Sequence, residues 1–84
     1  MEEVTNLANT INSAFGVSVD CKIMAENRLE CWLRKEVSPP EVEKLFPDAV
    51  STEFQIPNSF KVGKVRVVMF RGLFPNYPIR GALV

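Results

Sequence analysis

The stretch KVRVVMFRG, residues 64–72, decides the fold. Apolar side chains fall on both sides of an extended chain here: Val65, Val67 and Met69 on one side, Val68 and Phe70 on the other. A strand that is apolar on both faces is typical of the middle of a sheet, where both faces are covered. The sequence therefore predicts a central strand at this position, and the remaining residues must supply its cover.

The length and composition of the chain are those of one small domain. The chain has 84 residues, with ten basic and ten acidic side chains that cancel. This balance argues against a protein that binds duplex DNA mainly through charge. We expect a single domain over residues 1–84 that ends in an irregular tail, residues 73–84. The acidic, polar start does not resemble a signal peptide, so the two cysteines indicate free thiols and a cytoplasmic location.

Hydrophobic spacing predicts two helices and four strands. Apolar residues recur at helical spacing over residues 2–15, and a second, short helix begins at Ser38, whose spacing to Glu41 is that of a capping box. Alternating patterns predict strands in the order 17–24, 28–35 and 50–56, ahead of the central strand. Pro57-Asn58-Ser59 breaks the third of these, so a loop is expected over residues 57–63.

The link between the first two strands is short enough for a hairpin, and side-chain parity then fixes its register. The alternating apolar side chains of the two strands, Val17 among them, face one core only if paired residue numbers sum to an even value. A three-residue loop gives the pairs Ile23–Leu29, Lys22–Glu30 and Cys21–Cys31. The opposite charges of Lys22 and Glu30 favour this register independently.

The two halves of the chain resemble each other. VSVDCKI at 17–23 aligns with VSTEFQI at 50–56, and LECWLRK at 29–35 aligns with VRVVMFR at 65–71. We therefore expect an α+β fold made of two αββ repeats. They would form a four-stranded antiparallel sheet with two helices on one face, which resembles a circularly permuted ferredoxin-like sandwich. Strands 28–35 and 64–72 would be central.

The residues of common catalytic and metal sites are missing from the sequence. The chain has no histidine, its two aspartates lie in different elements, and its four glycines are scattered. The αββ layout also resembles LAGLIDADG homing endonucleases, but neither helix carries the terminal acidic residue that defines that family. We therefore expect that the protein has no enzymatic activity, no cofactor and no metal site.

Cys21 and Cys31 share the core side of their strands. Buried cysteine usually acts as a small hydrophobic residue, so both thiols are expected to be reduced and inaccessible. A cross-strand disulfide or redox switch is the alternative, and it would need solvent access.

The sheet face away from the helices is the candidate binding surface. Apolar and basic side chains gather there, and we take as candidate site residues Trp32, Phe70, Arg66, Arg34, Val68 and Met24. Glu53 and Gln55 would lie at its edge. An exposed apolar patch of this kind usually marks a contact site, and Trp and Arg are enriched where binding energy concentrates.

The sequence leaves three possibilities for what covers this face. The tail could fold over it, a partner protein or a second copy could bury it, or single-stranded nucleic acid could bind there. Aromatic residues flanked by arginines on central strands are similar to the RNA-recognition motif, and SFKVG at 59–63 resembles a fragment of filamentous-phage single-stranded DNA-binding proteins. The first hypothesis is a small regulatory module that binds a partner protein, or a second copy as a homodimer, through this face or through the tail, with no membrane partner. Single-stranded nucleic-acid binding is the alternative.

Overall fold

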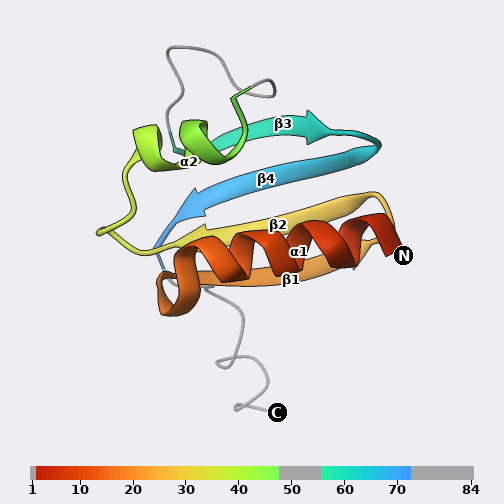
Figure 1. Ribbon diagram of the computed structural model, residues 1–84, viewed down its shortest axis with the longest axis horizontal. Coiled ribbons are helices and arrows are strands. Elements are labelled where there is room, and N and C mark those ends of the chain that lie inside the picture. Colours follow the sequence, from red (N-terminus) through yellow and green to blue (C-terminus); the bar gives the residue numbers. More distant parts are fainter. Residues whose placement is uncertain (1, 48–55, 73–84) are drawn as a thin grey trace.

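A computed structural model describes residues 2–47 and 56–72 of the chain (Figure 1). In chain order, the elements are α1 (Glu2–Phe15), a short 3-10 helix η1 (Gly16–Ser18), β1 (Val19–Ala25), β2 (Arg28–Leu33), α2 (Pro39–Leu45), β3 (Asn58–Val62) and β4 (Val65–Arg71). The order of two helices and four strands is that predicted from the sequence.

The strands form one mixed sheet in the order β1-β2-β4-β3. The central positions of β2 and β4 agree with the prediction, and β4 is buried on its core side at Val65, Val67 and Met69. The prediction of an antiparallel sheet is wrong, because β2 and β4 run parallel, with Leu29 beside Val67 and Cys31 beside Met69. The other neighbouring strands are antiparallel.

The fourth strand lies later in the sequence than predicted. Residues 58–62 were expected to be a loop, but they form β3, which pairs with β4 and turns Phe60 into the core beside Val67. The side chain of Asn58 accepts the Ser59 N–H at 2.6 Å. The predicted strand 50–56 cannot be compared, since residues 50–55 lie outside the described part of the chain.

The β1–β2 hairpin has the predicted register. Cys21 pairs with Cys31, Lys22 with Glu30 and Ile23 with Leu29, before a bulge at the end of β1. The inward assignment of Val17 is wrong: it lies in η1 and is 88% exposed. Gly16 precedes it with φ +57°, and this left-handed turn delays the start of the strand.

Both helices cover the same face of the sheet. The α1 stripe buries Val4, Leu7, Ala8 and Ile11, and α2 adds Val42, with Val37 and Phe46 on either side of it. These side chains join the inward residues of the strands in one core cluster. Figure 1 shows α1 over β1 and β2, and α2 beside β3 and β4.

Side-chain contacts fix the N-terminal ends of both helices. The Glu3 carboxylate near the start of α1 accepts the Lys64 N–H in the β3–β4 turn at 3.1 Å. At α2, the Glu41 carboxylate accepts the Ser38 N–H at 2.9 Å and its hydroxyl at 3.1 Å, which completes a capping box. Arg71 at the end of β4 donates from Nη1 to the carbonyls of Arg34 and Val37, each at 2.6 Å, and so holds the segment that leads into α2.

The protein therefore has an α+β fold with a four-stranded mixed sheet and two helices. The permuted ferredoxin-like arrangement, which is antiparallel throughout, is not confirmed. The duplication is not confirmed either, because the strand beside β4 is Asn58–Val62 and not the segment 50–56 that aligned with 17–23.

We predict that Ser38→Ala destabilises the domain by about 1 kcal/mol, because the substitution removes one side of the α2 cap. For a domain of this size, the melting temperature should fall by roughly 4–8 °C, as measured by circular dichroism. An unchanged melting temperature would contradict the cap.

The destabilisation caused by Ser38→Ala should depend on pH. The N–H and hydroxyl of Ser38 hold the pKa of Glu41 below its ordinary value. A lowered carboxyl pKa adds stability above the ordinary pKa, and this stability is lost as the pH falls through the folded value. The difference between wild type and Ser38→Ala should therefore shrink in acid, and Glu41→Gln should differ from wild type only above that range.

Gly63→Ala should destabilise the β3–β4 turn. Gly63 has φ +62°, where a side chain costs roughly 1–2 kcal/mol, and an added Cβ would overlap the Glu3 carboxylate that holds the turn. We expect a lower melting temperature in thermal unfolding.

Gly16→Ala is the matched control. Its φ is +57°, but an added Cβ there meets no neighbouring atom within 4 Å, so it carries the backbone cost alone. Glu3→Ala should remove the excess cost of Gly63→Ala over Gly16→Ala. Equal costs at the two glycines, in the presence of Glu3, would contradict the contact between Glu3 and the turn.

Candidate functional site

Residue parity places a set of polar and aromatic side chains on the side of the sheet opposite the core. We call this surface the outer face. Its residues are Asp20, Lys22, Arg28, Glu30, Trp32, Ser59, Lys61, Arg66, Val68 and Phe70. Neither described helix lies on this surface, since both pack on the core side.

An aromatic pair occupies one end of the outer face. Trp32 on β2 is the direct neighbour of Phe70 on β4, and their ring centroids lie 4.2 Å apart with planes 16° from parallel. Neighbouring strands are about 4.8 Å apart, so these rings stack along the direction between the strands. They therefore stand on edge and present their rims outward. Both rings and the adjacent Val68 are half-buried.

Cations form a row at the other end of the outer face. Arg28, Arg66 and Lys61 are neighbours across β2, β4 and β3, and all three are exposed. Arg28 forms an ion pair with Glu30 at 3.2 Å, and Arg66 donates to the Ser59 hydroxyl at 3.3 Å. The parallel register produces this row, because it aligns Arg28 with Arg66.

The structure brings together only part of the predicted site. Trp32, Phe70, Val68 and Arg66 lie on adjacent central strands. Arg34 lies beyond the end of β2, where its Nε donates to the Val17 carbonyl at 2.9 Å. Met24 falls in the bulge of β1 and is 52% exposed, away from the aromatic pair.

Ser59 and Lys61 are outer-face residues that sequence reasoning missed. They were assigned to a loop because Pro57-Asn58-Ser59 suggested a break. The signal that could have found them is the alternation of apolar Phe60 and Val62 with polar Ser59 and Lys61. Arg28 was not among the candidate residues, and its role in the row depends on the parallel pairing.

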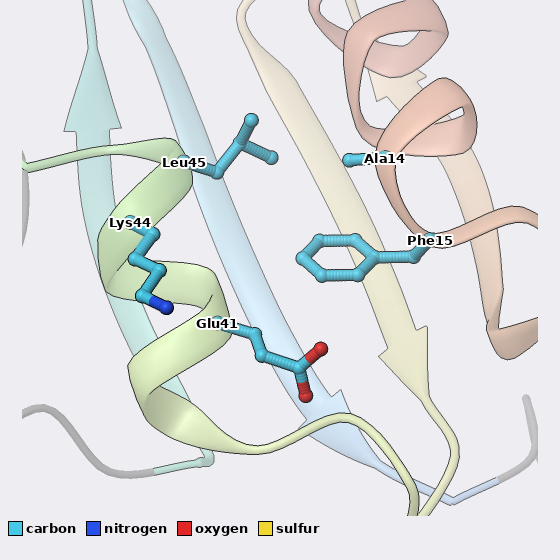
Figure 2. A pocket seen from close by; sticks show the side chains of 5 residues that line it. All are labelled: Ala14, Phe15, Glu41, Lys44 and Leu45. Carbon is cyan, nitrogen blue, oxygen red and sulfur yellow. The ribbon is translucent and has the colours of Figure 1, made fainter.

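The core side offers a groove between the helices. Figure 2 shows Ala14 and Phe15 of α1 facing Glu41 and Leu45 of α2, with Lys44 at the rim. The volume is about 330 Å³, near the lower end for small-molecule sites. The polar lining of the groove consists of Lys44 and of Glu41, whose carboxylate is already engaged by Ser38, so few polar groups are available to orient a ligand.

Within residues 2–47 and 56–72, no three His, Cys, Asp or Glu side chains are grouped so that they could hold a metal ion. No described helix combines the length and apolar character needed to cross a membrane. The predicted cover by the tail, and the predicted edge positions of Glu53 and Gln55, lie outside the described residues. The outer face is thus the best-defined candidate site in the part of the chain that the structure describes.

Comparisons of the chain with protein-family models, with curated proteins and with solved structures found no match.

Proposed function

We propose that this domain is a protein-interaction module that binds a partner through the outer face, without enzymatic activity. The stacked, half-buried Trp32–Phe70 pair is the observation that supports this proposal most. It lies on the sheet surface that neither described helix covers.

The aromatic pair suits a protein contact because it is apolar and held in place. Trp is among the residues that contribute most to binding energy, especially when it is surrounded by contacts that exclude water. Here the β2–β4 register and the stacking fix both rings before binding, so little side-chain entropy remains to be lost. Val68 extends the apolar centre beside them.

The charges around this centre indicate the chemistry of the partner. Arg28, Arg66, Lys61 and Lys22 outnumber Asp20 and Glu30 among the described residues of the outer face. A partner surface with an apolar patch and surrounding carboxylates would complement it. Two copies packed outer face to outer face with their strands parallel would set the basic rows against each other. For this reason we favour a different protein over a homodimer at this surface. A cytoplasmic setting, with a regulatory role, remains part of the proposal.

Single-stranded nucleic acid is the second candidate, and the row formed by Arg28, Arg66 and Lys61 favours it. Such a row can follow a phosphate backbone. However, base recognition of this type needs aromatic ring faces turned outward, and Trp32 and Phe70 stack on each other with their rims outward. For this reason, protein binding ranks first.

We predict that a photo-crosslinking residue at Lys61 captures a discrete partner in an extract of the source cells. Excess wild-type protein should compete, and Trp32→Ala should compete at least thirtyfold less well, because loss of a binding hot spot costs about 2 kcal/mol or more. The same crosslinker at Asn9, which is exposed on α1, should capture no such partner.

Circular dichroism must first show that Trp32→Ala keeps its fold. Equal competition by folded Trp32→Ala and wild type would contradict a contact at the outer face. Trp32 is the only tryptophan, so its fluorescence tests the alternative directly. Salt-sensitive quenching by a short single-stranded oligonucleotide would reverse the ranking of the two functions. A dimer in light scattering that Trp32→Ala dissociates would identify the partner as a second copy.

A further inference from the structure

Two thiols face each other across the β1–β2 hairpin. Cys21 and Cys31 are direct partners in the register, and their Sγ atoms are 3.8 Å apart. Both are free cysteines. No helix or loop separates them, so bond formation requires only movements within the hairpin.

The backbone geometry at this pair permits a disulfide. The Arg34 N–H donates to the Ser18 carbonyl at 2.9 Å, which makes residues 18 and 34 a hydrogen-bonded pair. Such pairs alternate along an antiparallel ladder, so Cys21 and Cys31 form a non-hydrogen-bonded pair, with Cα atoms about 4.5 Å apart. Disulfides span Cα separations of roughly 4.4–6.8 Å, so this one could close without breaking ladder hydrogen bonds.

The two sulfur atoms differ in access. Cys31 lies on a central strand and is fully buried, whereas Cys21 is half-buried on β1. In the described part of the chain, no strand pairs with the other edge of β1. Burial of both thiols was expected; Cys31 is fully buried, whereas Cys21 is only half-buried, and we take the edge of β1 as the route by which a small oxidant reaches it.

The electrostatics also distinguish them. The hydrogen bond from the Cys31 thiol lowers the pKa of Cys21, against the opposing effects of burial and of the Asp20 carboxylate. The same contact and burial raise the pKa of Cys31. Cys21 is thus the more acidic thiol, and the thiolate is the nucleophilic form of cysteine.

We propose that Cys21 and Cys31 form a reversible dithiol–disulfide site that hydrogen peroxide oxidises, with Cys21 as the reacting thiol and Cys31 as the resolving thiol. The outer-face function is not needed for this inference, because both sulfur atoms lie on the core side of the hairpin.

The chemistry balances in two steps. The Cys21 thiolate attacks one peroxide oxygen; an S–O bond forms, the O–O bond breaks, and the departing hydroxide takes up the proton that Cys21 released on ionising. Cys21 is then a sulfenic acid, oxidised by two electrons. The Cys31 sulfur next attacks the Cys21 sulfur; the S–S bond forms, the S–O bond breaks, and the hydroxide leaves with the Cys31 proton as water. In total, two thiols and one peroxide give one disulfide and two waters.

The disulfide would join the edge strand to a central strand. While the thiols are reduced, β1 is held to β2 by hydrogen bonds and packing alone. After oxidation, a covalent bond would tie the middle of β1 to the middle of β2, and a thiol reductant would release it. The site would therefore control how readily the edge strand separates from the sheet.

The test treats the reduced 84-residue chain with increasing hydrogen peroxide and maps its peptides without reduction. We expect the monomer to lose two hydrogen atoms, a peptide that links Cys21 to Cys31 to form, and dithiothreitol to reverse both changes. Met24 is 52% exposed and serves as an internal reference for unspecific oxidation. The disulfide should form before Met24 is oxidised.

Two variants separate the roles of the thiols. In Cys31→Ala, Cys21 should stop at the sulfenic acid, which dimedone captures; in Cys21→Ala, Cys31 should not react. If either variant fails to fold, the result for the wild-type chain is sufficient to test the proposed disulfide. Oxidation of Met24 without the internal disulfide, or a disulfide only between chains, would overturn the proposal.

Discussion

The parallel pairing of β2 with β4 is the constraint on which the rest of the structure depends. On the core side it sets Leu29 beside Val67 and Cys31 beside Met69, and all of these side chains are fully buried. On the outer face the same register sets Trp32 beside Phe70 and Arg28 beside Arg66. The core and the candidate site therefore both depend on the register of this one strand pair. A change that shifts the pairing by one residue would exchange the two faces and expose the core set.

The direction of this pairing also limits the internal symmetry. A two-fold axis along the sheet normal relates two αββ units only if the central strands are antiparallel. A two-fold axis in the plane of the sheet makes them parallel, but it carries one helix to the opposite face. The described elements combine parallel central strands with both helices on one face, so no two-fold rotation relates the described αββ units to each other. The similarity between VSVDCKI and VSTEFQI therefore does not correspond to a symmetric fold.

The sequence predicted what local patterns determine. The α1 stripe, the cap of α2 and the hairpin register follow from residues close in the chain, and the Lys22–Glu30 pair specified that register independently. Alternation also identified Trp32, Val68 and Phe70 as members of one face. It could not give the direction of β2 relative to β4, because alternation reports which face a side chain occupies and not which way the strand runs. The turn-forming residues at 57–59 led to the prediction of a loop in place of β3. The contribution of Lys61 to the basic row was therefore not predicted.

Nuclear Overhauser contacts across the central strands test the parallel pairing most directly. The structure predicts contacts between the rings of Trp32 and Phe70, between Leu29 and Val67, and between Arg28 and Arg66. An antiparallel pairing centred on the same Glu30–Val68 neighbours would instead place Trp32 beside Arg66 and Arg28 beside Phe70. Observation of that second set, without contacts between the two aromatic rings, would contradict both the fold and the candidate site.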